Sequence, residues 1–285
     1  AIPSFKGKLH SRTLESLVKE VTNLVKKGYK DFSFVSQDSS SYLRDLGHND
    51  GLEQLIDAVE KIDGVKTARI LYLYPSTTTH NLIDKIADSK VFVNYFDMPL
   101  QHISQNMLKI MKRGKGAEKL IELMNYMRSK PNSFVRTTFI AGHPGESEDD
   151  FEELCSFVED FGFDRGNVFS YSDEEGTSAE TRDDKIEQEL IDERAEILGD
   201  IISQTTIKSL ENDIGKSFEV YIDGESEEHE YLLSARKTIW APQIDGEIYI
   251  NDNEDNIPIV FGEIYEVEAT QLAGDKLLAK IIRKV

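Results

Sequence analysis

The sequence predicts an α/β fold followed by a small all-β barrel, and three observations support that prediction. From about residue 13 to 180, amphipathic helical patterns alternate with short apolar runs typical of buried strands. Residues 186–212 form one long, charged helical pattern. From Gly215 onward the pattern changes to five short β-type runs, separated by turns rich in Gly, Asp and Asn.

The first part of the chain contains five strand–helix alternations. Its first helix shows the reasoning: Thr13 is a capping residue, apolar side chains recur at helical spacing as far as Val25, and Gly28 ends the pattern. Short apolar strands that alternate with helices predict a parallel sheet covered by helices. The expected helices are 13–27, 51–62, 79–87, 117–128 and 147–161, and the expected strands are 31–36, 68–74, 91–98, 134–140 and 167–171.

The second part of the chain reads as a closed barrel. Five short strands in about 70 residues are typical of a barrel of the oligonucleotide-binding type. We therefore place domain boundaries so that residues 1–184 form the α/β barrel part, 185–213 a connecting helix and 214–285 the β-barrel. The expected strands are 218–222, 231–235, 246–250, 263–269 and 277–282.

Composition limits the setting and the partners. The 285 residues carry a formal net charge of −20, which repels phosphate backbones and favours a basic protein partner over nucleic acid. We find no run of eighteen apolar residues and no signal peptide, so we expect a cytoplasmic protein without membrane contact.

The sequence offers no metal site. Cys155 is the single cysteine and lies in an amphipathic helical pattern, so we expect a buried structural thiol. One thiolate cannot hold a four-iron cluster, which normally takes several. His102 and His143 have no evident third ligand beside them, and metal binding is therefore not expected.

Polar residues, Gly and Pro recur where each expected strand ends. In a parallel α/β sheet the carboxyl ends of the strands share one edge, where functional residues gather. The sequence therefore predicts a site across the top of an α/β barrel. The runs at the five strand ends are 37–38, 74–75, 99–102, 142–146 and 172–175.

Several of these residues can have either a ligand-binding or a structural role. Arg136 can grip a ligand carboxylate with two parallel hydrogen bonds, or it can form an ion pair. Gln101 can bond ribose hydroxyls or a carboxylate, or it can stabilise its own loop. Asp38 can accept from an ammonium group or cap the following turn. Gly142 and Gly145 can let backbone approach a ligand, or they can simply make a turn.

The whole chain, in order and spacing, resembles the radical S-adenosylmethionine methylthiotransferases. Residues 1–12 resemble the segment directly after the third cysteine of that family's iron–sulfur motif. The final part resembles the family's TRAM domain. The remaining matches are 36–38 (Ser-Gln-Asp), 96–102 (Phe-Asp-Met-Pro-Leu-Gln-His), 136–146 (Arg-Thr-Thr-Phe-Ile-Ala-Gly-His-Pro-Gly-Glu) and 171–177 (Tyr-Ser-Asp-Glu-Glu-Gly-Thr).

The resemblance implies a partial radical-SAM (β/α) barrel followed by a TRAM barrel, with S-adenosylmethionine as cofactor. It also implies two [4Fe-4S] clusters in the full-length enzyme, and none in these residues, because the cluster cysteines and the first barrel strand would precede Ala1. We therefore expect no catalytic residue and no metal ligand here, and an inactive fragment. The cofactor-binding residues it implies are Ile2, Gln37, Asp38, Gln101, Arg136, Gly142, Gly145 and Glu146.

Two positions depart from the family pattern. His143 stands where relatives usually carry Phe, and Ser39 stands where they usually carry Thr. Both departures concern fine contacts of the site.

The resemblance is strongest to the branch that modifies an aspartate of the twelfth small-subunit ribosomal protein. That branch implies methylthio transfer to the β-carbon of the aspartate and a basic ribosomal protein as partner. Two alternatives stay open: a tRNA adenosine methylthiotransferase, and a non-catalytic acidic module that only binds the ribosomal protein. Residues 215–285 carry 7 Lys/Arg and 15 Asp/Glu, a net charge of −8, which disfavours RNA as the main partner.

Overall fold

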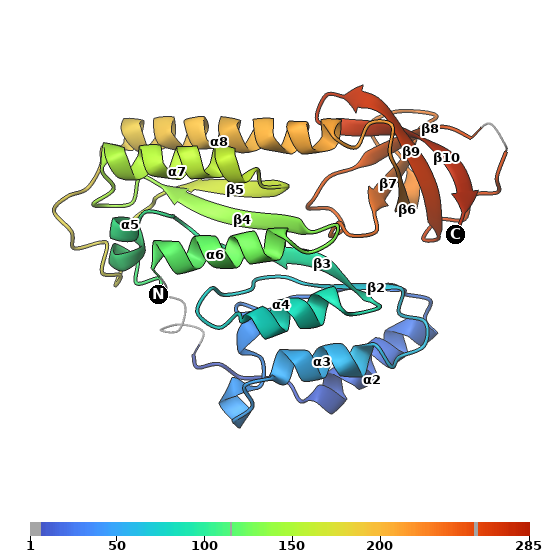
Figure 1. The fold of residues 1–285 in the computed structure, drawn as a ribbon, viewed down its shortest axis with the longest axis horizontal. Coiled ribbons are helices and arrows are strands. Elements are labelled where there is room, and N and C mark those ends of the chain that lie inside the picture. The colour runs from blue at the N-terminus through green and yellow to red at the C-terminus, as the bar shows by residue number, and fades with distance from the viewer. Residues whose placement is uncertain (1–6, 115, 254–255) are drawn as a thin grey trace. The chain divides into compact units, whose positions relative to one another are not determined.

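The computed structural model describes residues 7–114, 116–253 and 256–285. The chain divides into two compact units, residues 1–202 and 203–285 (Figure 1). The domain boundaries drawn from the sequence stay predictions; helix α8 (Gln188–Glu211) crosses the division between the units. Among the described residues, no helix is both long enough and apolar enough to cross a membrane.

The first unit contains a five-stranded sheet in which every neighbouring pair is parallel. Strand order follows chain order, as expected when each strand is joined to the next by a helical crossover. The expectation of a parallel sheet covered by helices is confirmed. The strands are β1 (Asp31–Phe34), β2 (Thr67–Ile70), β3 (Phe92–Asp97), β4 (Phe134–Ala141) and β5 (Arg165–Ser170).

The helices begin at the capping residues that the sequence offers. The side chains of Thr13, Thr79 and Ser147 each accept a hydrogen bond from a backbone N–H of the first turn. Helix α5, which Ser104 caps in the same way, was not predicted from the sequence. The helices of this unit are α2 (Leu14–Lys26), α3 (Gly51–Val59), α4 (His80–Ala87), α5 (Gln105–Ile110), α6 (Ala117–Arg128) and α7 (Glu148–Phe161), with 3₁₀ turns η1 (Ser39–Ser41) and η2 (Arg44–Leu46).

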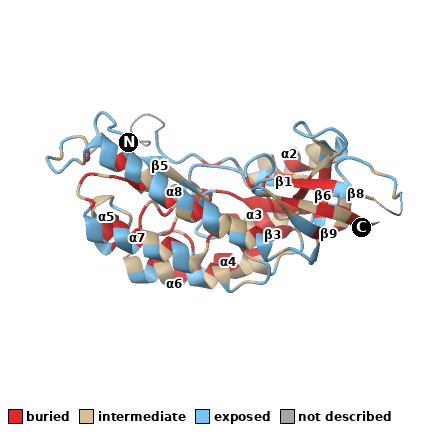
Figure 2. Cartoon of the chain, turned by 90° about the horizontal axis from the view of Figure 1, so that it is seen from above, coloured by how far each residue is buried: buried red, intermediate tan, exposed pale blue. Residues whose placement is uncertain are grey.

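The sheet has one apolar and one polar face. Ile70, Phe96 and Val135 belong to the core between strands and helices, and Figure 2 shows buried residues on strands and on one side of the helices. Neighbouring strand residues point to opposite faces, so Asp97 and Arg136 lie on the inner face of this half-barrel. The two side chains form an ion pair on that face.

Strand β2 is shorter than the sequence suggests. The β-type run continues to Tyr74, but the strand ends at Ile70. Tyr72 takes a left-handed φ of 58° and donates its N–H to the Asp97 carboxylate at 3.1 Å. A residue with that φ cannot continue a ladder, so a contact from β3 ends the strand.

The strands end at different levels, so a residue near the start of one strand can lie beside the ends of its neighbours. Register places Phe34, Ile70, Phe96 and Val135 at one level. Strands β1 to β3 end at or next to this level, whereas β4 continues to Ala141. Arg136 is therefore level with the carboxyl ends of β1 to β3, although it stands near the start of its own strand.

The second unit is a closed five-stranded barrel, which confirms the expected all-β fold. Its interior is apolar, with Val220, Ile248, Tyr265 and Leu277 fully buried. The strand order around the barrel is β10-β8-β7-β6-β9. The strands are β6 (Ser217–Glu225), β7 (Leu233–Lys237), β8 (Ile248–Asp252), β9 (Ile264–Ala273) and β10 (Lys276–Lys284).

Candidate functional site

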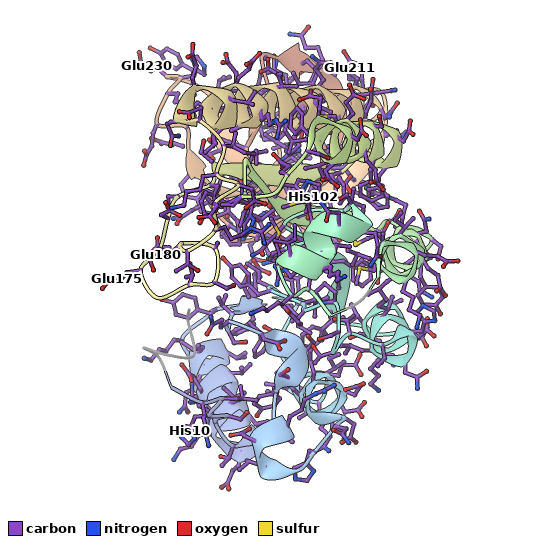
Figure 3. The ribbon with its side chains drawn as sticks, turned by 90° about the vertical axis from the view of Figure 1, so that its left-hand side faces the viewer. His10, His102, Glu175, Glu180, Glu211 and Glu230 are labelled. Atoms are coloured by element: carbon purple, nitrogen blue, oxygen red, sulfur yellow. The ribbon has the colours of Figure 1, made fainter. Side chains whose placement is uncertain are left out.

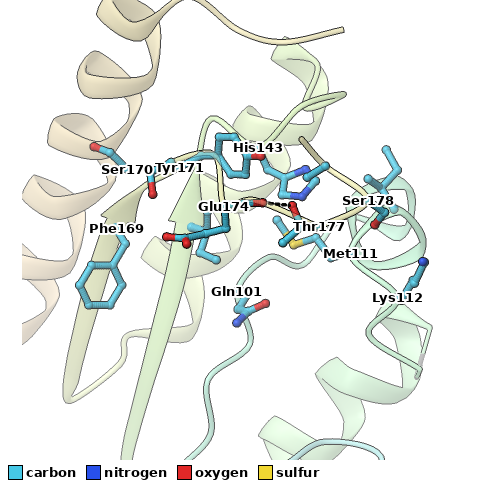
Figure 4. A pocket seen from close by; sticks show the side chains of 14 residues that line it. Gln101, Met111, Lys112, His143, Phe169, Ser170, Tyr171, Glu174, Thr177 and Ser178 are labelled. Carbon is cyan, nitrogen blue, oxygen red and sulfur yellow. Dashed lines mark hydrogen bonds between the residues drawn. The ribbon is translucent and has the colours of Figure 1, made fainter. Parts of the chain in front are cut away.

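A pocket opens at the carboxyl edge of the parallel sheet. Its volume is about 550 Å³. Gln101 enters it from the loop after β3, and Phe169 and Ser170 enter from β5 (Figure 4). The loop after β5 closes one side through Glu174 and Thr177. Figure 3 shows that this loop, which also bears Glu175 and Glu180, stands out from the side of the unit.

Gln101 is held rigidly at the pocket. Its backbone is left-handed, with φ 68°, and it forms an isolated parallel bridge to Phe139 of β4. Its N–H donates to the Thr138 carbonyl at 2.8 Å, and its own carbonyl accepts from Ile140 N–H at 2.9 Å. The side-chain amide forms no hydrogen bond with any residue in the described ranges, so both its donors and its acceptor are available to a ligand.

His143 contributes a hydrogen-bond acceptor to the pocket lining. Its Nδ1 lies 2.9 Å from the Pro144 carbonyl, which can only accept, so Nδ1 carries the proton and Nε2 is the free acceptor. Burial lowers the pKa of His143 and keeps the ring neutral. The ring packs edge-to-face on Tyr171 at 5.0 Å. Burial, and the Asp173 carboxylate that accepts from its hydroxyl, raise the pKa of Tyr171 to about 12.

Glu146 is buried, and its carboxylate bonds to the chain itself. It accepts from Gly142 N–H at 2.8 Å and from Arg194 Nη1 at 2.8 Å. It also lies 3.1 Å from His102 Nε2, which carries the proton because Nδ1 accepts from the N–H groups of Ile103 and Ser104. Glu146 thus fixes the loop 142–146. A direct contact with a cofactor stays a prediction.

Packing requires Gly142, and backbone conformation favours glycine at both Gly142 and Gly145. A Cβ on Gly142 would lie 2.5 Å from Cγ1 of Ile191, and a Cβ on Gly145 would lie 2.8 Å from Arg182. Both residues have left-handed φ angles, 79° and 88°. The structure therefore supports a role of these glycines in forming the turn. Close approach of their backbone to a ligand stays a prediction.

The other predicted residues lie at the same edge with partners of their own. Arg136 is nearly buried, its Nη1 3.5 Å from Asp97 Oδ2. Asp38 accepts from the hydroxyls of Ser40 and Ser41, so it holds the η1 turn. Gln37 is exposed. Cofactor contacts of these residues stay predictions, and Ile2 lies outside the described residues.

Sequence reasoning missed part of the pocket. Met111 and Lys112 line it, although no motif in the sequence pointed to either residue. Phe169 is 59% exposed, an unusual state for a strand residue of this size. Phe169 was within the predicted strand 167–171, but nothing in that run indicated which face of the strand would stay exposed to solvent.

No metal centre is formed by the residues that the structure describes, since none of their His, Cys, Asp and Glu side chains gather in threes. Cys155 lies on α7 and is half-buried, and burial raises the pKa of its thiol to about 11. A protonated thiol packed into a helix interface does not fit a cluster ligand, which must be a thiolate.

The start of α7 carries a strongly shifted carboxyl group. Asp150 accepts from Ser104 Oγ at 2.6 Å, from Asn106 Nδ2 at 2.8 Å and from Ser147 Oγ at 2.7 Å. Burial alone would raise the pKa of Asp150, but these hydrogen bonds outweigh it and lower the pKa from 3.8 to about 2. The ionised Asp150 carboxylate therefore stabilises the fold, and that stabilisation is lost at low pH.

We expect Asp150→Asn to destabilise the chain near pH 5 by about 2 kcal/mol more than it does near pH 2. The folded-state pKa is depressed, so the stabilisation is fully present above the unfolded value of 3.8 and is lost as pH falls towards 2. Urea unfolding of wild type and variant at several pH values measures the difference. Asp149→Asn, at an exposed neighbour on the same turn, is the control and should change the free energy of unfolding by less than about 0.5 kcal/mol.

Two family models match the chain. The model described as the radical SAM superfamily matches residues 1–158, and the model of the TRAM domain matches residues 214–282. Among curated proteins, the chain is 79% identical over 285 residues to the ribosomal protein uS12 methylthiotransferase RimO of Aliarcobacter butzleri. It is 61% identical over 284 residues to the protein of that name from a Sulfurovum species. The chain spans 64% of the length of each, while 99% and 100% of this chain is covered.

Among solved structures, the chain resembles coproporphyrinogen III oxidase (HemN) from Escherichia coli, a radical SAM enzyme. The TM-score is 0.51 at 16% identity, and the match covers 70% of this chain and 45% of the other. At that identity the likeness concerns the fold alone.

Proposed function

Because this chain belongs to the radical SAM superfamily, we propose that it is the S-adenosylmethionine-binding and TRAM part of a ribosomal protein uS12 methylthiotransferase. The reaction adds a methylthio group to the β-carbon of an aspartate of uS12. The observation that supports this most is identity of 79% and 61%, across essentially the whole chain, to two relatives that carry that name. Ribosomal proteins are made in the cytoplasm, which is the setting that we propose.

The pocket suits S-adenosylmethionine, which, cleaved with one electron from a cluster of the full-length enzyme, would supply the 5′-deoxyadenosyl radical that removes hydrogen from the substrate carbon. The Phe169 and Tyr171 rings offer apolar surface to the adenosyl group and exclude water from it. Gln101 presents a free amide to ribose hydroxyls or a carboxylate. His143 presents a fixed acceptor, Nε2, to a ligand N–H. The chain's part in the reaction is binding, orientation and exclusion of water.

Residues 1–285 do not offer the cysteine ligands that the family's iron–sulfur cluster requires. The chain has one cysteine, and Cys155 sits on α7 with a raised pKa rather than at the edge where the pocket opens. We propose that residues 1–285 alone hold no cluster and show no activity. Reconstitution with iron and sulfide should therefore give protein without the cluster's visible absorption. Iron and sulfide bound in proportion to protein, with that absorption, would contradict the proposal.

The charge of the barrel supports a protein substrate over tRNA. Residues 215–285 have a net charge of −8, whereas RNA affinity depends largely on neutralising phosphates. An acidic surface instead attracts a basic protein. The tRNA enzyme would show a steep loss of tRNA affinity with rising salt.

The proposed function is tested with the full-length, cluster-loaded enzyme and purified uS12. We expect a mass increase of one methylthio group in place of hydrogen, located on an aspartate. Gln101→Ala should weaken binding of S-adenosylmethionine at least tenfold, because the only amide aimed into the pocket among these lining residues is lost. Gln54→Ala, on the outside of α3, is the matched control. Unmodified uS12 together with modified tRNA adenosine would favour the alternative enzyme.

A further inference from the structure

Tyr72 occupies a backbone conformation that bulky side chains rarely adopt. It comes two residues after the end of β2, and its φ of 58° lies in the left-handed region. For an aromatic residue this conformation is strained, and it persists only where the surroundings enforce it. Strain of this kind is found at functional sites more often than elsewhere.

Hydrogen bonds from the end of β3 and from the η1 turn enforce the conformation. Tyr72 N–H donates to Asp97 Oδ2 at 3.1 Å, and the Tyr72 carbonyl accepts from Ser39 N–H at 3.0 Å. The next residue, Leu73, donates its N–H to the Asp97 carbonyl at 2.8 Å. Asp97 is 1% exposed, and its carboxylate lies beside Arg136 on the inner face of the sheet. A buried ion pair therefore fixes the position of Tyr72.

The conformation holds an aromatic ring at the carboxyl edge of the sheet. The Tyr72 side chain is 38% exposed, and its hydroxyl forms no hydrogen bond with the residues that the structure describes. Tyr72 is not among the residues that line the pocket, which come from the ends of β3 to β5 and from neighbouring loops. The ring therefore lies at this edge outside the pocket proposed for the adenosyl group, where the second reactant, the protein substrate, can reach it.

We propose that Tyr72 is a substrate-binding residue, whose ring and hydroxyl contact a basic segment of the protein substrate, and that Asp97 positions it. The inference rests on the proposed function and adds to it the residue that contacts the substrate. The chain's net charge of −20 favours a basic segment over an acidic one. A cationic side chain binds well over a tyrosine ring, and a preformed ring costs little entropy on binding.

The test uses the full-length, cluster-loaded enzyme, with labelled uS12 binding followed by fluorescence anisotropy. Asn tolerates the left-handed region better than other non-glycine residues, so Tyr72→Asn removes the ring without adding strain. We expect uS12 to bind Tyr72→Asn at least tenfold more weakly, with no fall in the thermal unfolding midpoint. Tyr72→Phe keeps the ring and should weaken binding by about two- to fivefold, the loss of one hydrogen bond.

Tyr29→Asn is the matched control. Tyr29 is 58% exposed and precedes β1, at the opposite, amino edge of the sheet, so its variant should bind uS12 as the wild type does. Wild-type-like binding by Tyr72→Asn would overturn the inference while leaving the proposed function intact. So would a loss confined to S-adenosylmethionine affinity. Failure of the wild-type enzyme itself to bind and modify uS12 would instead overturn the proposed function.

Discussion

Gly142→Ala should lower the free energy of unfolding by about 3 kcal/mol or more, because left-handed strain and overpacking add at one position. The new Cβ would lie within 3.0 Å of three atoms of Ile191, including its Cβ, and the φ of 79° is already unfavourable for a side chain. Ile191 is buried and β-branched, so no change of rotamer removes the contact. Urea unfolding of residues 1–285 measures the loss.

Two further variants separate the causes of that loss. Gly176→Ala has the same kind of backbone, φ 77°, but nothing within 4 Å of the new Cβ, so it should cost about 1 kcal/mol from strain alone. Ile191→Ala should restore part of the stability lost in Gly142→Ala, which a double-mutant cycle detects. Equal losses in Gly142→Ala and Gly176→Ala would show that contact with Ile191 is not the cause.

Glu146→Ala is expected to cost about 4 kcal/mol, as removal of one partner from a buried ion pair generally does. The change would leave Arg194, 4% exposed, and the fully buried His102 without their shared acceptor. It would also free Gly142 N–H, so the loop beside the pocket should loosen and cofactor binding should weaken with stability. Denaturant unfolding and calorimetric titration with S-adenosylmethionine report the two effects.

Glu148→Ala provides the control for the ion pair. Glu148 also bonds Arg194, but its side chain is 66% exposed, so its loss should cost less than about 1 kcal/mol. A cost for Glu148→Ala equal to that of Glu146→Ala would mean that burial does not govern the energy of this cluster.

The order of elements followed from local pattern. Helix α6 has the bounds that its periodicity predicted, and Thr13 and Ser147 cap helices as their residue types suggest. The parallel sheet and the closed barrel were also predicted, because apolar alternation and turn residues record which surfaces are buried.

The hydrogen-bond partners of single polar residues did not follow from pattern. The carboxylates of Asp38 and Glu146 accept hydrogen bonds from serines and from Arg194 that no sequence spacing indicates, and their contacts with the cofactor stay predictions. Lys112 lines the pocket from a segment in which the sequence showed no motif. A polar side chain forms a hydrogen bond with the group that the fold brings within about 3 Å. Because that partner can be distant in the chain, local sequence does not reveal it.

The sequence by itself determined an α/β part with a parallel sheet, followed by a small all-β barrel, since these depend on the periodic burial of apolar side chains. Tertiary structure alone decided where β2 ends, how Gln101 is turned into the pocket and why Tyr72 is strained. Each of those outcomes depends on a hydrogen bond from a neighbouring strand, from Asp97 or from β4, and such contacts arise only after the strands have come together.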